Sequence, residues 1–541
     1  MGTAPAPAAA TPAAATRAPD GVTAPEGSRE QRPPVAAVTG PPAAAAPDRR
    51  PLPWGWPVAG ALALLASAPL SDNSFLTHLA TGRVLLDGGL PAVNPFLRSG
   101  GDFPVPSWWW SGLLAVAERT GGGTGIRLMV VALAATLGGL LVRLVRPLPS
   151  AAGTTAVPGP SSIAVLVPVT LVVLCLLPFL TPRPHLAGFV LLALALVVQA
   201  ERRSAWWLVP VVATWVNVHG TWLYGLVVLG LLCAADVVDG PRAGWARGAA
   251  LRRSAAVVGA AALGAALGGL LYPERLRLVG LPFEQLGDDR ARAALAGFSE
   301  WQAAGAGHPL TWILLALGLM AVVATVRSHR WAGATAAVLF VALGLSAGRL
   351  LPVAAIVLVP WAAGALAPAT AAAPASGGGA GSRRGGGADR ATLAVRGVGL
   401  ALGLAAVVAV AVTPAYDLSA YPVAAVRWLD ERGLVGDPEV VLVSHDYTGN
   451  YLEFRNGPGV GVWVDDRAGT DLALDYSTLN RLRPGWREAL GRSGAQVVLW
   501  NDTRPLTAEL GADPDWVTAA HIDGFTVFCR TSLARRCAAT P

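Results

Sequence analysis

The polar residues of this sequence that are able to do chemistry fall at the ends of apolar segments. The set holds two acids, two arginines, two histidines and an asparagine, namely Asp72, Arg183, His185, Asn217, His219, Glu300 and Arg349. Once the arginines of the connecting loops set the orientation of the chain, all of these residues fall near one membrane face. Acids, arginines and histidines gathered at that depth indicate a site for a charged substrate on a lipid carrier.

The composition places most of the chain in lipid. Hydrophobic residues make up 53% of the sequence and charged residues only 14%, whereas soluble domains carry about 25% charged residues. All 41 basic residues are arginines, which we attribute to the base composition of the genome. The net charge of +7 reflects topology, because membrane proteins collect arginines in cytoplasmic loops. No basic surface interleaved with aromatic residues is present, so we expect no nucleic-acid partner.

About eleven predicted membrane spans position these residues. An apolar helix of roughly 20 residues crosses a bilayer. The arginine clusters fall in alternate loops, which puts the N-terminus in the cytoplasm and, with an odd number of spans, the C-terminus outside. We therefore predict a mainly α-helical, polytopic membrane bundle over residues 54–413. The predicted spans are 54–71, 124–142, 162–180, 185–200, 205–217, 221–238, 255–271, 309–326, 331–347, 350–367 and 397–413.

Three further regions flank or interrupt the bundle. Residues 1–53 are rich in Ala, Pro and Thr and lack apolar periodicity, which predicts a disordered cytoplasmic tail with no signal peptide. The Gly, Ala and Ser content of residues 368–396 predicts a flexible cytoplasmic linker. Residues 414–541 carry 17 acidic residues against 12 arginines and are long enough to bury a core. They predict an extracytoplasmic α/β domain, called the C-terminal domain below.

Apolar periodicity within the C-terminal domain predicts short elements. Helices are expected at 423–434 and around 486–490, and strands at 440–443, 460–464, 497–500 and 525–530, the last as an edge or final strand. Two polar clusters at strand ends, His445-Asp446 and Asp465-Asp466-Arg467, serve either packing and domain docking or substrate contact. Cys529 and Cys537 either form a disulfide or stay free. Cys175 and Cys233 are expected to pack as small apolar side chains within spans.

The first loop, residues 72–123, is predicted to be an outer loop and holds further candidates. Asp72 stands at the end of the first span, and an interfacial helix with an apolar face follows it. Asp72 either contributes to a site or only caps this helix. The aromatic run Trp108–Trp110 is expected to anchor at lipid headgroups. Asp87 and Asp102 are either second carboxylates of the site or turn residues.

The first loop resembles that of a known superfamily. Its order of an acid at the end of the first span, an interfacial helix, Gly, Pro and an aromatic-rich second interfacial helix is similar to the GT-C integral-membrane glycosyltransferases. These include the protein mannosyltransferases and the lipid A aminoarabinose transferases. More narrowly, the sequence resembles a bacterial multi-span group of this class over residues 54–541. The matching residues are Asp72, Phe75, His78, Gly82, Gly88, Pro91, Asn94-Pro95, Trp108, Arg183-Pro184-His185, Trp215 to Gly220, Glu300-Trp301, Asn450-Tyr451-Leu452 and Val464 to Arg467.

The resemblance implies a polyprenyl-phosphate-linked sugar as donor and an envelope glycan, lipid or protein as acceptor, reached from outside. Asp72 would be the catalytic carboxylate that takes the acceptor proton. Arg183 and Arg349 would bind the phosphate, because a guanidinium offers a planar fork of donors to phosphate oxygens. The remaining members of the expected substrate-binding set are His78, His185, Asn217, His219 and Glu300.

The sequence departs from the superfamily at one position. Many members carry two adjacent acids there, often linked with metal binding, whereas Asp72 is followed by Asn73. We therefore predict no metal ligands, although a divalent cation as cofactor stays open.

The candidate residues also have structural interpretations. Arg349 can extend along a span to the lipid headgroups, and Arg183, between two prolines, can anchor a tight loop. Asn217 and His219 can satisfy backbone groups where an apolar run breaks. Glu300 lies in a long segment, 272–308, that can cover a substrate.

Two other functional classes stay open. One is a non-catalytic envelope-assembly or glycan-binding membrane protein, which the single acid at Asp72 allows. The other is a transporter, which is expected to show internal repeats around a site at mid-membrane depth. The sequence shows no such duplication.

Overall fold

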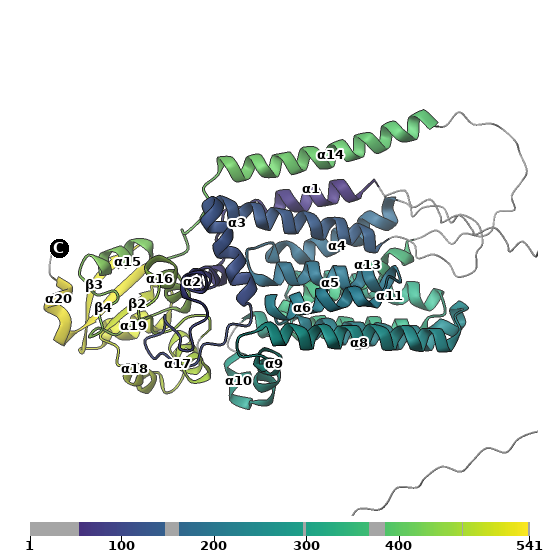
Figure 1. Ribbon diagram of the computed structural model, residues 1–541. Helices are drawn as coiled ribbons and strands as arrows, with labels where there is room; N and C mark the ends of the chain where they lie inside the picture. The colour runs from purple at the N-terminus through teal and green to yellow at the C-terminus, as the bar shows by residue number, and fades with distance from the viewer. Residues whose placement is uncertain (1–52, 146–161, 296–298, 367–384, 468, 539–541) are drawn as a thin grey trace, which may run out of the picture. The chain divides into compact units, whose positions relative to one another are not determined.

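The computed structural model describes residues 53–145, 162–295, 299–366, 385–467 and 469–538. Residues 1–52 of the predicted tail and residues 368–384 of the predicted linker lie outside this part of the chain. The described residues are mainly helical, with one four-stranded sheet near the C-terminus (Figure 1).

Apolar helices coincide with all the predicted spans. They are α1 (Gly55–Leu65), α3 (Trp108–Leu144), α4 (Ser162–Leu176), α5 (Pro184–Ala200), α6 (Leu208–Val218), α7 (Trp222–Asp239), α8 (Arg247–Leu271), α11 (Pro309–Arg327), α12 (Trp331–Ser346), α13 (Leu351–Ala365) and α14 (Gly385–Val412). Within the described residues, 7 helices are long and apolar enough to cross a membrane, namely α3, α4, α7, α8, α11, α13 and α14, three of them extended by short 3-10 turns. The others are shorter, so the number of spans stays a prediction.

Two of these helices begin earlier than the sequence predicts. Helix α3 starts at Trp108 and is kinked at Gly122, whose φ of 59° and ψ of −153° suit glycine alone. The part of α3 before the kink is the expected second interfacial helix. Helix α14 starts at Gly385, so the last residues of the predicted linker are helical.

The bundle core is built from small and branched apolar side chains of α3, α4, α5, α6, α11 and α13. Helix α14 packs chiefly along α1 (Figure 1). One buried charge joins these elements, since the guanidinium of Arg127 on α3 donates to backbone carbonyls of Ser67, Val410, Thr413 and Pro414. A guanidinium at this depth is favourable because the carbonyls at helix C-terminal ends carry partial negative charge.

Shorter elements connect the bundle to the cavity described below. They are α2 (Asn73–Gly88), α9 (Arg277–Gly287), α10 (Asp289–Leu295) and the 3-10 turns η4 (Ser299–Trp301) and η5 (Gly348–Leu350). Helix α2 packs closely on α3, since a Cβ on Gly82 would lie 1.9 Å from the carbonyl oxygen of Ser111. The predicted covering segment 272–308 therefore contains α9, α10 and η4.

The C-terminal domain is an α/β unit, as predicted. Its sheet has the order β1-β2-β4-β3, with β1 parallel to β2 and the other pairs antiparallel. The strands are β1 (Leu442–Ser444), β2 (Val497–Asn501), β3 (Trp516–Ile522) and β4 (Phe525–Arg530). The helices are α15 (Val423–Asp430), α16 (Asp446–Asn456), α17 (Thr470–Asn480), α18 (Trp486–Ser493), α19 (Pro505–Ala512) and α20 (Ala534–Ala538).

One prediction for this sheet is wrong, namely the strand at residues 460–464. Strand β4 is the final strand of the chain, one of its two predicted positions, and it is internal in the sheet, because β3, which the sequence analysis missed, pairs with its free side. Residues 460–464 do not join the sheet. Instead Val462 exchanges backbone hydrogen bonds with the first loop, to Phe96 and from Arg98, both at 2.9 Å. This apolar run therefore docks the C-terminal domain on the first loop. Its local pattern is the same as that of a strand in the sheet, so the sequence could not tell the two apart.

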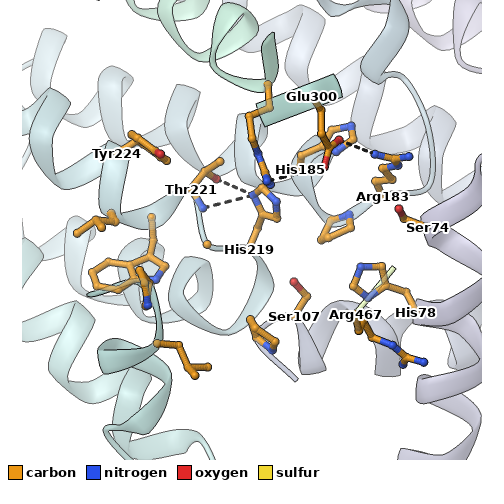
Figure 2. A pocket seen from close by; sticks show the side chains of 18 of the residues that line it. Ser74, His78, Ser107, Arg183, His185, His219, Thr221, Tyr224, Glu300 and Arg467 are labelled. Atoms are coloured by element: carbon orange, nitrogen blue, oxygen red, sulfur yellow. Dashed lines mark hydrogen bonds and ion pairs between the residues drawn. The ribbon is translucent and has the colours of Figure 1, made fainter. Parts of the chain in front are cut away.

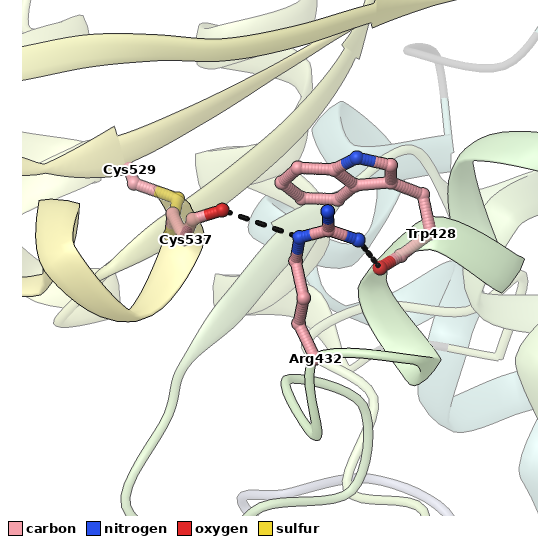
Figure 3. The surroundings of a disulfide bond; sticks show 4 residues. All are labelled: Trp428, Arg432, Cys529 and Cys537. Carbon is pink, nitrogen blue, oxygen red and sulfur yellow. Dashed lines mark hydrogen bonds between the residues drawn. A yellow bond between two sulfur atoms is a disulfide. The ribbon is translucent and has the colours of Figure 1, made fainter. Parts of the chain in front are cut away.

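The structure decides the state of the cysteines. Cys529 at the end of β4 and Cys537 on α20 form a disulfide (Figure 3). Arg432 lies against the Trp428 ring and donates to the Cys537 carbonyl at 3.2 Å. Helix α20 is therefore held by both the disulfide and this hydrogen bond. Cys175 and Cys233 are free and buried in the bundle, as predicted.

Candidate functional site

A cavity of about 340 Å³ lies where the bundle, the first loop and the C-terminal domain meet (Figure 2). Helix α2 contributes Ser74 and His78, and the segment before α11 contributes η4 and apolar residues of α9. The C-terminal domain contributes Asp466 and Arg467. Residues from all three parts therefore form one site.

Most of the residues predicted for a site are brought together here. The structure places six of them in the cavity wall, namely His78, Arg183, His185, His219, Glu300 and Arg349. Asp72 lies beside the cavity, behind Arg183, and Asn217 does not line it. The clustering predicted from the ends of the spans therefore holds for most of the set.

Alternating acids and arginines run along one wall of the cavity. The Arg183 Nε lies 2.6 Å from Asp72 Oδ1, and its Nη1 lies 3.0 Å from Glu300 Oε2. Arg349 Nη1 lies 3.8 Å from Glu300 Oε1, and its guanidinium stacks 4.1 Å from the centre of the Trp301 ring. Because each guanidinium has five N–H donors, both arginines retain capacity for an anion. Figure 2 shows Glu300 beside Arg183.

Asp72 caps a helix and also binds an arginine of the cavity wall. It caps α2 by accepting from the Ser74 backbone N–H at 3.0 Å, and the same oxygen binds Arg183. The side chain is only 12% exposed. It is thus placed to hold Arg183 in its orientation.

Asn217, predicted to bind substrate, lies outside the cavity wall. Its side-chain oxygen accepts from Trp108 Nε1 at 2.7 Å, and its nitrogen donates to the carbonyls of Ala213 and Gly268 at 2.8 and 2.9 Å. The residue is fully buried. Its polar groups therefore satisfy the backbone where α6 ends, which was the structural alternative.

The prediction that the tryptophans of the first loop anchor at headgroups is wrong for two of them. The indole of Trp108 binds Asn217, and Trp110 is buried and donates to the Pro182 carbonyl at 2.9 Å. Both side chains fix the start of α3 against the segments that carry Arg183 and His219.

The three histidines contribute neutral polar groups or packing. His78 Nδ1 lies 3.1 Å from Ser111 Oγ, His185 Nε2 lies 3.1 Å from the Phe179 carbonyl, and His219 Nδ1 lies 2.9 Å from Thr221 Oγ1. Burial, together with the charges of Arg467 and Arg183, lowers the pKa of His78 to about 3. At neutral pH this imidazole is uncharged, so the positive charge of the site comes from arginine.

The polar clusters of the C-terminal domain separate into packing and cavity residues. His445 stacks on Trp500 with ring centres 3.9 Å apart, and Asp446 accepts from the Tyr476 hydroxyl at 2.8 Å, so this pair serves packing. Asp465 is buried against Arg467. Asp466 and Arg467 face the cavity. The local sequence marked this cluster, but only the fold shows which acid points inward.

The other acids of the first loop lie outside the cavity wall. Asp87 pairs with Arg119 and Asp102 pairs with Arg277, and all four side chains are at least partly exposed. Neither acid supplies a second carboxylate beside Asp72.

The donors around Asp72 do not fit a divalent cation. In the described part of the chain, no group of three or more His, Cys, Asp or Glu side chains is placed to hold a metal ion. Asp72 Oδ1 is bound to the Arg183 guanidinium, and the following residue is an amide.

No protein-family model matches the sequence. No curated protein matches it either. A solved structure to which the chain is similar is that of the archaeal oligosaccharyltransferase AglB from Archaeoglobus fulgidus in complex with an inhibitory peptide and a dolichol-phosphate. The TM-score is 0.46 at 10% sequence identity, and the match covers 83% of this chain and 69% of that chain.

Proposed function

We propose that this protein transfers a sugar from a polyprenyl-phosphate-linked donor to a cell-envelope acceptor at the outer face of the membrane. The single observation that carries the proposal is the chain of contacts from Asp72 through Arg183 and Glu300 to Arg349 along the cavity wall. Two oriented guanidinium groups beside an apolar surface suit a phosphate attached to a lipid.

The cavity wall offers surfaces for both parts of such a donor. Arg183 and Arg349 would hold the phosphate oxygens, and Leu278, Leu281 and Leu223 would contact the first prenyl units. The seven helices that are long and apolar enough to cross a membrane would place the protein in the bilayer from which the donor enters. The orientation with the C-terminal domain outside the cell is part of the proposal, and it rests on the arginine distribution.

The proposed chemistry is substitution at the anomeric carbon. An acceptor atom forms a bond to this carbon while its bond to the phosphate oxygen breaks, and negative charge collects on the departing phosphate. Arg183 and Arg349 stabilise that charge, because preorganised donors cost no reorganisation during the reaction. Since Asp72 Oδ1 accepts hydrogen bonds from both Arg183 Nε and the Ser74 backbone N–H, we assign Asp72 as a positioning residue for Arg183.

The first experiment compares membranes with and without the protein. Mass spectrometry of a deletion strain is expected to show an accumulated lipid-linked sugar and the loss of one envelope glycan, both reversed by the wild-type gene. The purified protein is expected to bind farnesyl phosphate but not farnesol. Binding of farnesyl phosphate without any change in lipid-linked sugars would favour a non-catalytic envelope protein. Absence of both effects contradicts the proposal.

Glu300 is expected to compete with the donor phosphate, because its carboxylate bridges the two arginines. The variant Glu300→Gln should therefore bind farnesyl phosphate more tightly, by up to about fivefold, the range of an ion pair that is partly exposed. Titration calorimetry measures this change. Glu284→Gln, which alters an exposed acid on α9, should bind like the wild type. Weaker binding by Glu300→Gln would show that Glu300 orders the arginines instead.

A further inference from the structure

The segment that carries Asp466 is held rigidly between the C-terminal domain and the first loop. Arg467 binds Asp465 at 2.8 Å and also contacts Glu453 on α16 and Thr81 on α2. The backbone N–H of Asp466 donates to Asn450 Oδ1 at 3.1 Å. Helix α16 also lies very close to this segment. A Cβ on Gly449 would be 1.9 Å from the Val464 carbonyl oxygen.

In the part of the chain that the structure describes, the cavity wall holds two acids, Glu300 and Asp466. Glu300 binds arginine through both of its oxygens, whereas Asp466 has an oxygen to which none of the described residues donates. Its carboxylate lines the cavity and accepts a hydrogen bond from the Ser74 side chain. Its Oδ1 is buried, and among the described residues it has no hydrogen-bond partner. A buried acceptor without a partner is unfavourable, because it has lost its hydrogen bonds to water. This cost is removed when a ligand in the cavity donates to the oxygen, so the geometry points to a donor group of a substrate.

The remaining acids near the cavity are already occupied by arginine. Asp72 and Glu300 bind Arg183, while Asp465 and Glu453 bind Arg467. Of these four acids only Glu300 lines the cavity, and both of its oxygens face arginines. Asp466 is thus the acid of the cavity wall with an oxygen open to a ligand among the described residues.

The surroundings of Asp466 adjust its basicity. Burial raises its pKa to about 6, and the nearby Asp465 carboxylate adds to this effect. Arg467, the Ser74 hydrogen bond and Arg183 act in the opposite direction. Asp466 is therefore mostly ionised at neutral pH and is a stronger base than an ordinary aspartate. The titratable or charged groups that face it are Asp465 and Arg467 on its own segment, Arg183 before α5, Glu453 on α16 and Tyr421 before α15.

We propose that Asp466 is the general base of the site and that the acceptor it activates carries a hydroxyl group. This inference rests on the sugar transfer proposed above. The acceptor O–H donates its proton to Asp466 Oδ1 as its oxygen bonds to the anomeric carbon of the donor. The bond from that carbon to the phosphate oxygen breaks, and its electron pair leaves with the polyprenyl phosphate, held by Arg183 and Arg349. The proton then passes from Asp466 to water, which restores the carboxylate.

The test uses the full-length protein and the Asp466→Asn variant. The donor is a lipid extract of the deletion strain, and envelopes of the same strain supply the acceptor. The variant should transfer sugar about 100-fold more slowly, the lower end of the range for a general base. Its affinity for farnesyl phosphate should be unchanged or higher, because a negative charge has been removed from the cavity. Asp523→Asn is the matched control, since Asp523 is exposed in the turn between β3 and β4 and its positive φ suits Asn.

The pH profile separates a base from a residue that only maintains the fold. A base must be deprotonated, so the wild-type rate should fall as the pH drops through about 6. The Asn variant should lose this acidic limb, and Asp466→Glu should recover part of the rate. The hydrogen bond from Ser74 lowers the pKa of Asp466 in the wild type. Its loss in Ser74→Ala should raise this pKa, so the acidic limb should move to higher pH. This second variant keeps the test informative if the Asn variant folds poorly.

The outcomes distinguish the two proposals. If the wild-type protein transfers sugar and Asp466→Asn does so at a similar rate, or if the acidic limb stays in place in both variants, Asp466 is not the base and the proposed function stands. If the wild-type protein neither consumes a lipid-linked sugar nor binds farnesyl phosphate, the proposed function itself is wrong, and the role of Asp466 falls with it.

Discussion

Asp72→Asn is expected to slow sugar transfer by about 10- to 200-fold, the loss that follows when a charge-assisted hydrogen bond worth 1.5–3 kcal/mol is removed. In the variant Arg183 loses the carboxylate that lies 2.6 Å from its Nε and keeps only Glu300. The guanidinium should then turn toward Glu300 and leave the position in which it meets the donor phosphate. Transfer with the lipid extract of the deletion strain measures the effect.

The choice of Asn separates the two contributions of Asp72. Asn is as good as Asp at a helix N-cap, so the bond from the Ser74 N–H is retained and the melting temperature should not change. Asp72→Ala removes the cap as well and should destabilise the protein by about 1 kcal/mol. Asp87→Asn changes an exposed acid of the same helix and should have no effect on transfer. Transfer at the wild-type rate in Asp72→Asn would reject the role of Asp72.

Arg349→Gln is expected to weaken the binding of farnesyl phosphate by about 10- to 200-fold, again the range for a hydrogen-bonded charge. Arg349 lies in the cavity wall with a side chain 25% exposed, and Trp301 orients it from one side. Arg349→Lys should give an intermediate affinity, because an ammonium keeps the charge but loses the planar fork and the stacking surface. Titration calorimetry with farnesyl phosphate compares the three proteins.

The salt dependence provides an internal check on Arg349. Added salt should weaken the wild-type binding of farnesyl phosphate more than that of Arg349→Gln, since one charge contact has been lost. Arg277→Gln alters an arginine that binds Asp102 and Glu274 outside the cavity wall, so it should bind like the wild type. Equal affinity in Arg349→Gln and the wild type would support the alternative in which Arg349 only reaches toward lipid headgroups.

The site combines groups from distant parts of the chain. The bundle and the first loop hold the proposed phosphate ligands, and the C-terminal domain supplies the proposed base. Arg83 of α2 fastens these parts together, because it donates to the Phe454 carbonyl at 2.6 Å and lies over the Phe454 ring. Without the C-terminal domain the cavity would lack both Asp466 and Arg467, so the cavity is incomplete in the bundle alone.

Features that depend on neighbouring residues were predictable from the amino-acid order alone. The apolar helices, the helix that follows Asp72 and the strands β1, β2 and β4 lie where periodicity placed them, because burial of one face leaves a regular spacing in the chain. The change in composition after residue 413 likewise marked the α/β domain. The clustering of Arg183, His185, His219, Glu300 and Arg349 followed from topology, since the ends of alternate spans meet at one membrane face.

Pairings between distant residues were decided by the tertiary structure. Arg183 and Asp72 are 111 residues apart, and Arg467 and Thr81 are 386 residues apart. No local pattern reports such partners. For the same reason the sequence analysis assigned Asn217 to the substrate, whereas its side-chain oxygen accepts from Trp108. It likewise assigned residues 460–464 to the sheet, whereas Val462 pairs with the first loop. Adjacent acids such as Asp465 and Asp466 have the same local sequence, and only three-dimensional packing sets which one is neutralised by arginine and which faces the cavity.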